Sequence, residues 1–255
     1  ELTIDEQITA FRAQQDGFLG LSFSTIAGFN ANGALPHYRA TEESYSDIQG
    51  DGLLLIDSGG QYEDGTTDIT RVVPIGDPSF EQKRDYTLVL KCHIALAQTV
   101  FPEGIAAPLL DSITRKTLWQ YGLDYRHGTG HGVGYALNVH EGPQVISYYS
   151  PATIYTKLRK GMITSNEPGL YHEGKYGIRI ENLVVNQPKV FQDQTYGDFL
   201  EFETLTLCPI DQTCIVLDLL SNDEKAWLNQ YHQMVRERLS PDLKGEVLTW
   251  LVNNT

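Results

Sequence analysis

The chain has 255 residues, enough for one sizeable core, and its 33 acidic and 19 basic side chains give a net charge of −14. This excess of acid argues against a nucleic-acid partner and against an anionic membrane surface, because both attract basic patches. The sequence contains no apolar stretch long enough to span a bilayer and no visible signal peptide.

The first expected element is a helix near the N-terminus. Thr3 and Glu6 would open it as a capping box, and Ile4, Ile8 and Phe11 would form its apolar face. The later expected elements are strands near 23–29 and 53–73, a helix from Asp77-Pro78 to about Phe101, a helix from about Pro108 to Tyr121 that stops at Gly122, strands at 162–185 and 199–207, and helices near 222–239 and 241–252. The succession indicates a chain of mixed α and β structure.

Two of the expected strands carry a carboxylate. The apolar run Leu53–Ile56 ends in Asp57 and then glycines, which is typical of a buried strand that delivers a side chain at its end. The β-branched run that follows contains Asp68, and Asp64-Gly65 between the two runs predicts a tight turn. A hairpin of this length would place Asp57 and Asp68 side by side.

Three later segments add further titratable side chains. A glycine-dense stretch contains His127 and His131, which suggests backbone that passes close to a ligand. Glu167 ends another strand, before a Pro-Gly turn. Arg179 and Glu181 lie on the same face of a later strand, because side chains alternate with a period of two.

Each of these residues also has an ordinary structural explanation. An Asp at a strand end usually caps a turn, a Glu before Pro-Gly usually belongs to the turn, and a lone His is usually structural. Asp68 and Glu181 are harder to explain in this way, because acidic residues are depleted from strand interiors. The candidate metal ligands, in chain order, are Asp57, Asp68, His131, Glu167 and Glu181. Four carboxylates and one imidazole can hold two divalent cations, and pairs of ions about 3.5–4 Å apart activate water for hydrolysis.

These segments resemble the catalytic domain of the metallopeptidases with the pita-bread fold, which include methionine aminopeptidases, prolidases and aminopeptidases P. The resemblance is strongest to the larger, cytosolic type of aminopeptidase P and reaches the C-terminal residues 227–232. The matching motifs are Ile56–Arg71, His127–Gly134, Asn138–Pro143 and Gly177–Asn182. One departure is Asn166, where related enzymes often carry Asp before Glu-Pro-Gly.

The resemblance implies an α+β pita-bread fold, in which two pseudo-symmetric halves form a curved antiparallel sheet covered by helices. It predicts a dinuclear-metal peptidase domain at 1–210 and a C-terminal helical extension, packed on that domain, at 211–255. The family's upstream N-terminal domains are expected to lie outside this chain. Since the extension is associated with dimers in the larger aminopeptidases P, a homodimer through this region is one expectation. A helix that packs only on its own domain is the alternative.

The same resemblance implies how the ligands divide between the metals. Asp68 and Glu181 would bridge both ions, Asp57 would bind one, and His131 with Glu167 would bind the other. The donor set and the family favour Mn²⁺, with Zn²⁺ and Co²⁺ as alternatives. A metal-bridging hydroxide would then hydrolyse the bond between an N-terminal residue and a following proline.

Catalytic roles are implied for five side chains. Glu167 would move the proton from water to the leaving nitrogen, which matters because the amide before proline has no hydrogen on its nitrogen. His37, His127 and His140 would donate hydrogen bonds around the intermediate, and His37 and His140 would also bind substrate. Arg179 would hold carboxylate oxygens as a bidentate pair.

The sequence therefore predicts a cytoplasmic metalloaminopeptidase whose partner is a peptide with proline in second position. Prolidase, which cuts Xaa-Pro dipeptides, is the nearest alternative, and cleavage of longer peptides distinguishes the two. A non-catalytic binding module on the same fold is the alternative of another class, and it would be expected to lack ligands. The scattered Cys92, Cys208 and Cys214 are expected to be reduced thiols.

Overall fold

The computed structural model describes residues 1–193 and 195–255, and its centre consists of antiparallel sheets. The first sheet, in the order β2-β3-β6, contains β2 (Ile26–Phe29), β3 (Gly52–Ser58) and β6 (Ile69–Ile75). The second sheet, in the order β10-β13-β14-β7, contains β7 (Val100–Pro102), β10 (Ile163–Asn166), β13 (Asn182–Lys189) and β14 (Phe199–Thr204). The smaller sheets contain β1 (Phe18–Leu21), β4 (Gly60–Tyr62) and β5 (Gly65–Thr66); β8 (Gly130–His131) and β9 (Val145–Ile146); and β11 (Gly169–His172) and β12 (Tyr176–Arg179).

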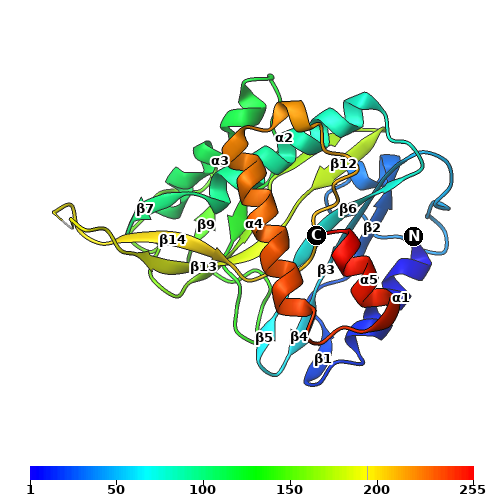
Figure 1. The fold of residues 1–255 in the computed structure, drawn as a ribbon, viewed down its shortest axis with the longest axis horizontal. Helices are drawn as coiled ribbons and strands as arrows, with labels where there is room; N and C mark the ends of the chain where they lie inside the picture. Colours follow the sequence, from blue (N-terminus) through cyan, green and yellow to red (C-terminus); the bar gives the residue numbers. More distant parts are fainter. Residues whose placement is uncertain (194) are drawn as a thin grey trace.

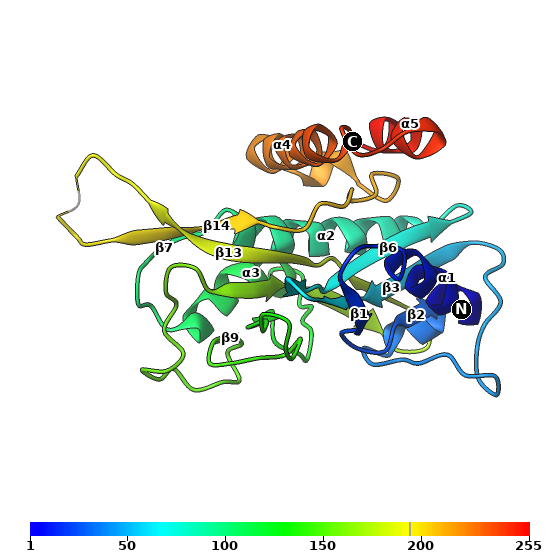
Figure 2. The same ribbon diagram turned by 90° about the horizontal axis from the view of Figure 1, so that it is seen from below.

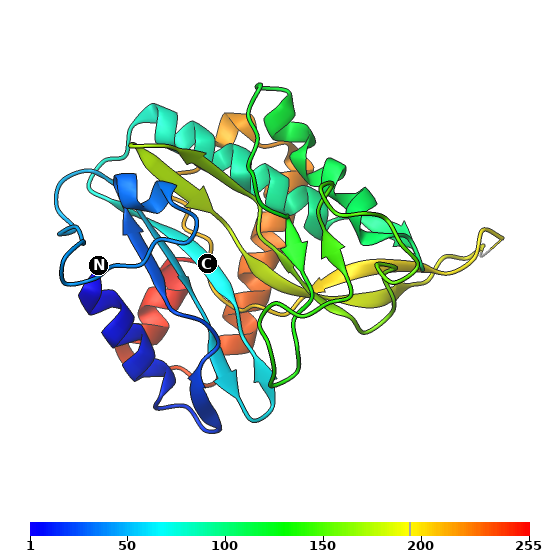
Figure 3. The ribbon, with the colours of Figure 1, turned by 180° about the vertical axis from the view of Figure 1, so that it is seen from behind.

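Helices lie on both sides of these strands. The α-helices are α1 (Leu2–Arg12), α2 (Phe80–Ala97), α3 (Asp111–Trp119), α4 (Asn222–Leu239) and α5 (Gly245–Asn253), and the short 3₁₀ helices are η1 (Asn30–Ala34), η2 (Ala107–Leu110) and η3 (Leu217–Leu219). In Figure 1, α4 crosses in front of the strands, and Figure 2 shows α4 and α5 as a layer on one side of the molecule. Figure 3, from the opposite face, shows the blue-to-cyan strands of the first sheet beside the green-to-yellow strands of the second, with α2 running past both.

The core gathers around α2. Leu88 and Leu90 of this helix belong to one buried cluster with Leu55 of β3 and Val235 of α4. Leu96, near the end of α2, belongs to a second cluster with apolar residues of β7, β13 and β14. Because α2 contributes to both clusters, it fixes the first sheet, the second sheet and the C-terminal helices relative to one another.

The predicted hairpin at 53–73 is present. In β3 and β6, Asp57 lies opposite Thr70 and Ser58 opposite Ile69. The turn is carried by the β4–β5 extension, where Tyr62 pairs with Gly65. The loop residues are therefore 63 and 64, one position earlier than the Asp-Gly signal suggests.

The predicted starts of the first two helices and the predicted end of the second are wrong. Thr3 lies inside α1, which begins after Glu1 without a side-chain cap. Helix α2 begins after Ser79, because the Ser79 hydroxyl and the Gln82 side chain satisfy each other's backbone N–H groups, whereas Asp77 bonds to Lys83 Nζ at 2.8 Å.

The predicted end of that helix near Phe101 is also too late. Helix α2 ends at Ala97, and Phe101 instead lies in β7. There its ring packs on Phe202 of β14, with ring centroids 4.9 Å apart. Burial of this aromatic pair therefore favours a strand at a position where the sequence continues the helical pattern.

Of the C-terminal helices, α4 begins at Asn222 as the sequence predicts, whereas α5 begins at Gly245 and not near 241. Helix α4 has a capping box of Ser221 and Glu224, and Glu224 also pairs with Lys91 of α2 at 2.6 Å. Leu228 and Val235 of α4 are buried in the core, so this helix packs on its own chain. Among the described residues, none of the helices combines the length and the apolarity that crossing a membrane requires.

Candidate metal centre

Three carboxylates meet where the first sheet faces the turn between β12 and β13. Asp57 stands near the end of β3, and Asp68 comes directly before β6, its hairpin partner. Glu181 lies between β12 and β13, and its backbone N–H donates to the carbonyl of Thr70 at 3.1 Å. Ligand oxygens of Asp57, Asp68 and Glu181 lie within 4.8 Å of one another, so these residues can share a metal ion.

A second group joins the first through Glu181. One ligand atom from each of His131, Glu167 and Glu181 also lies within 4.8 Å of the others. His131 is in β8, which runs so close to β10 that a Cβ at Gly130 would collide with the carbonyl oxygen of Ser165. The Ser165 hydroxyl accepts from the His131 N–H and donates to Glu167 Oε1, each at 2.9 Å. The structure thus brings all five predicted ligands together.

The contacts of His131 and Asp57 test whether cations fit this site. His131 Nδ1 lies 3.0 Å from the carbonyl oxygen of Gly132, so Nδ1 carries hydrogen and Nε2 is the candidate metal-binding nitrogen. Nε2 lies 3.2 Å from Glu167 Oε1 and 3.6 Å from Asp68 Oδ2. Asp57 Oδ1 is buried and has no hydrogen-bond partner among the described residues. An imidazole nitrogen that faces two carboxylates and a buried oxygen without a donor both fit the binding of cations.

The carboxylates repel one another strongly without cations. Burial, followed by the charges of Asp57 and Glu167, raises the pKa of Asp68 to about 8. Burial and the neighbouring carboxylates also raise the pKa of Glu181 well above its ordinary value. The pKa of Asp57 is raised by burial, although Arg179 opposes this. Divalent ions would remove this penalty by supplying positive charge.

His131 and Glu167 form an ion pair inside the site. Burial disfavours the charged form of His131, but the hydrogen bond and charge of Glu167 outweigh it and raise the pKa of His131 to about 9. Burial likewise opposes ionisation of Glu167, but His131 lowers the pKa of that carboxyl to about 2. In the metal-free protein, the proton on His131 therefore balances the negative charge of Glu167. A metal ion would compete with that proton for His131.

Arg179 organises one edge of the site. Its Nη2 donates to Asp57 Oδ2 at 2.5 Å, its Nε donates to the Thr70 hydroxyl at 3.1 Å, and its Nη1 donates to the Tyr171 hydroxyl at 2.6 Å. The predicted bidentate pair is therefore a single contact with Asp57. The Nε–H group holds Thr70, whose hydroxyl donates to Glu181 Oε2 at 2.7 Å.

The three predicted histidines occupy different positions. His127 is engaged by the chain, with Nδ1 2.8 Å from the carbonyl oxygen of Gly128 and Nε2 2.9 Å from the Tyr171 hydroxyl. Since that hydroxyl accepts from Arg179, it donates its own proton to His127, and burial lowers the pKa of His127. The exposed His140 ring lies 4.0 Å from that of His131 between centroids, and a nitrogen of His140 can join Asp68 and His131 in a ligand group. His37 is exposed on the loop after η1.

A pocket of about 660 Å³ contains the whole constellation. Its lining includes the five candidate ligands as well as His37, His127, His140 and Arg179. Arg39 and Phe23 also line it, and the sequence gives no local sign of this. Tyr171, which links Arg179 to His127, was also missed. The available signal was its strand: Tyr171 lies in β11, which pairs with the β12 strand that contains Arg179, and Gly169 of β11 lies opposite Arg179.

Family models match almost the entire chain. Metallopeptidase family M24 matches residues 1–188, and the C-terminal region of peptidase M24 matches residues 198–255. Aminopeptidase P2 of Arabidopsis thaliana is 51% identical over 261 residues, which cover 100% of this chain and 36% of the relative. The chain thus spans little more than a third of that protein.

Solved structures show the same fold. The X-prolyl aminopeptidase of Caenorhabditis elegans, described as a cytosolic enzyme with a di-nuclear active site, matches with a TM-score of 0.93 and 41% identity, over 100% of this chain and 41% of that one. Prolidase from Pyrococcus furiosus matches with a TM-score of 0.64 and 33% identity, over 72% of this chain and 52% of that one. These matches confirm the predicted α+β pita-bread fold.

Proposed function

The chain belongs to metallopeptidase family M24, and from this membership we propose that it carries the catalytic centre of a Xaa-Pro aminopeptidase. The reaction is hydrolysis of the bond between an N-terminal residue and a following proline. The main support is the pocket in which four carboxylates and one imidazole meet. The similarity to enzymes described as aminopeptidase P2 and X-prolyl aminopeptidase supplies the substrate class.

The proposal assigns two divalent ions to the site, with Mn²⁺ favoured over Zn²⁺ and Co²⁺ because oxygen ligands dominate. Asp68 and Glu181 would contact both ions, Asp57 would hold one ion, and His131 with Glu167 would hold the other. When bound, the ions lower the pKa of water and polarise the scissile carbonyl. The shared membership of Glu181 in two ligand groups supports this division.

The remaining side chains act on the substrate and on protons. Glu167 accepts a proton from the attacking water and delivers it to the proline nitrogen, which must be protonated before it leaves. His140 and His37 bind the substrate and donate hydrogen bonds to its carbonyl oxygen. His127, held by Tyr171, completes this wall of the pocket, and Arg179 keeps Asp57 in place.

Prolidase activity is the second candidate, because solved prolidases share this fold at 33% identity. The experiment measures cleavage of a Xaa-Pro dipeptide, a Xaa-Pro-Xaa tripeptide and a longer Xaa-Pro peptide after loading with Mn²⁺. An aminopeptidase releases the first residue from the longer substrates, whereas a prolidase cleaves only the dipeptide. Matched peptides with alanine in second position are the control, and their equal cleavage would contradict specificity for proline.

Metal content tests the class of protein. Elemental analysis after saturation with Mn²⁺ and removal of free metal should find two ions per chain. A chain with no bound metal would contradict the enzyme and favour a non-catalytic module.

The proposal also covers the organisation of the chain. We divide it into a peptidase domain at 1–210 and a C-terminal extension at 211–255, whereas the two family models match residues 1–188 and 198–255. A homodimer through the extension and a location in the cytoplasm follow by analogy, the latter with the relative described as cytosolic. Sedimentation equilibrium of the chain with and without residues 245–255 tests the dimer.

A further inference from the structure

We propose that Arg115 is a positioning residue for one half of the metal centre, the half that contains His131 and Glu167. This role rests on the proposed two-metal function. In this role an ion-pair cluster outside the pocket keeps one metal site in position, while Asp57 in the other site is held directly by Arg179.

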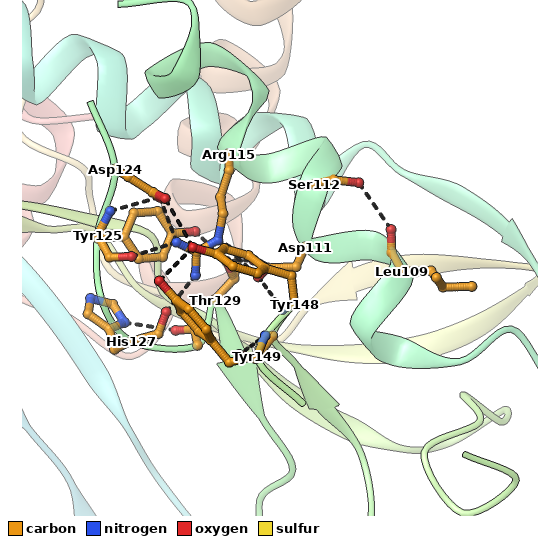
Figure 4. Close-up of polar contacts among 12 residues, drawn as sticks. Leu109, Asp111, Ser112, Arg115, Asp124, Tyr125, His127, Thr129, Tyr148 and Tyr149 are labelled. Carbon is orange, nitrogen blue, oxygen red and sulfur yellow. Dashed lines mark hydrogen bonds and ion pairs between the residues drawn. The ribbon is translucent and has the colours of Figure 1, made fainter. Parts of the chain in front are cut away.

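Arg115 is fully buried on α3 and is surrounded by groups that use its charge (Figure 4). Its Nε donates to both oxygens of Asp111, and its Nη1 donates to Asp124 Oδ1 at 2.7 Å. The guanidinium also lies 3.8 Å from the centroid of the Tyr125 ring and 4.7 Å from that of Tyr148. A group held on so many sides has little freedom to move, so it is a rigid anchor.

The same guanidinium holds the backbone that leads to the metal centre. Nη1 donates to the carbonyl oxygen of Tyr125 at 2.6 Å, and Nη2 donates to that of His127 at 2.5 Å. Asp111, its ion-pair partner, accepts from the Thr129 hydroxyl and from the N–H of Tyr148. Arg115 and Asp111 together therefore fix the segment 125–129 at three points.

The fixed segment 125–129 is connected to two metal-ligand candidates, one through a hydrogen bond and the other through the chain itself. The N–H of Glu167 donates to the carbonyl oxygen of Thr129 at 2.8 Å, so Thr129 sets the backbone position of that ligand. His131 follows Thr129 by two residues in the same chain segment, within β8. In the described part of the chain, the contacts of Arg115 and Asp111 do not include Asp57, Asp68 or Glu181. The short route from the cluster thus leads to His131 and Glu167, whereas Asp57 is reached only through the longer chain of His127, Tyr171 and Arg179.

Titration calorimetry with Mn²⁺ separates this role from a general effect on folding. The parent chain should bind two ions. Arg115→Lys keeps the charge but cannot reach the carbonyls and both carboxylates at once, so it should weaken one binding step by about tenfold to a hundredfold, as loss of outer-shell support does elsewhere. The other step should change by less than about twofold, because the ligands around Asp57 keep their supports.

Thr129 provides a second test that leaves the ion pair intact. Thr129→Val removes the hydroxyl that bonds to Asp111 and should weaken the same binding step, whereas Thr129→Ser keeps the hydroxyl and should bind both ions like the parent. Lys116→Ala, at an exposed position on α3, is the control and should bind both ions unchanged. If Arg115→Lys does not fold, the Thr129 pair decides.

Each contrary result has a definite meaning. Equal weakening of both steps in Arg115→Lys and Thr129→Val would show a purely structural cluster and overturn the proposal. Two unchanged steps in both variants would do the same. A parent chain that binds fewer than two Mn²⁺ would overturn the proposed metal centre itself, and this inference with it.

Discussion

Two groups of charged side chains differ in how their charge is balanced. Around Arg115, one guanidinium faces the carboxylates of Asp111 and Asp124 and the faces of two tyrosine rings. In the metal centre, four carboxylates face Arg179 and the imidazole of His131. The first group is nearly balanced by the chain itself, whereas the second carries excess negative charge.

The pKa values record this difference. Burial opposes ionisation of Asp124, but hydrogen bonds from Arg115 and its surroundings lower the pKa of that carboxyl below its ordinary value. Asp68, by contrast, has its pKa raised to about 8 by burial and neighbouring acids. The acids around Arg115 are neutralised by a side chain of the same protein. The acids of the metal centre would be neutralised by cations bound from solution.

The largest expected effect comes from breaking the balanced cluster. Arg115→Met leaves Asp111 buried without its partner, so the free energy of unfolding should fall by about 3–5 kcal/mol, with or without Mn²⁺. Denaturant unfolding in the presence and absence of Mn²⁺ measures this. Lys116→Met, on the exposed face of the same helix, should change it by less than about 0.5 kcal/mol. A loss of under 1 kcal/mol for Arg115→Met would mean that the cluster tolerates an unpaired acid.

Removing one charge from the unbalanced cluster should have the opposite effect on folding. Asp68→Asn should lower affinity for Mn²⁺ at least about a hundredfold, since a ligand matters more than an outer-shell partner. In the metal-free protein it should raise the free energy of unfolding by about 1 kcal/mol, because a repelling charge disappears. Elemental analysis and unfolding in chelator check both results. A less stable metal-free variant would contradict the view that Asp68 is under electrostatic strain.

His140 lies at the edge of the metal centre and could be either a metal ligand or a substrate-binding residue. Its nitrogen can join a ligand group, but its ring is exposed and lines the pocket. If it binds substrate, His140→Ala should keep two Mn²⁺ and lower kcat/KM by about tenfold to a hundredfold, mostly through kcat. Kinetics on a Xaa-Pro-Xaa peptide together with metal analysis decide this. Loss of one metal ion would instead make His140 a ligand.

The smallest expected effect concerns pH. An acid whose folded pKa is raised binds more protons in the folded state, so the metal-free protein should lose stability as pH rises from about 4 to about 8. Between pH 5 and 7 the loss should be on the order of 1 kcal/mol per pH unit and should shrink in Asp68→Asn. Asp124 acts oppositely, because a lowered pKa gives stability that disappears as pH falls below about 4.

Saturation with Mn²⁺ should reverse the slope between pH 5 and 7, because metal binding requires deprotonated ligands. Chemical unfolding at several pH values, with chelator or with Mn²⁺, measures both slopes. Identical slopes under the two conditions would show that the acids do not respond to metal.

The sequence predicts the two clusters unequally. Asp68 and Glu181 can be noticed because acids are rare inside strands, and the ordered ligand set resembles a known family. Arg115 has no such signal: in the helical pattern it looks like any polar residue near a helix end. Its burial depends on Asp124 and Tyr148, which come from other segments and meet it only in the folded chain.

The exact helix starts and hydrogen-bond partners could not be predicted from the sequence, because alternatives of similar energy compete. Asp77 and Ser79 are both good caps, and the reciprocal bonds of Ser79 with Gln82 decide between them. The single contact between Arg179 and Asp57 also could not be foreseen, because Thr70 and Tyr171 compete for the same guanidinium. Strand pattern therefore predicts which residues gather, but not how their donors are shared.

The contact between β8 and β10 has a consequence for engineering this protein. Because a Cβ at Gly130 would meet the carbonyl oxygen of Ser165, the two strands already touch through their backbones. The spacing between His131 and Glu167 therefore cannot be narrowed, and any added atom at position 130 would widen it. Attempts to fit a smaller ion should therefore vary the ligands themselves, since the backbone contact sets a lower limit on the gap between these strands.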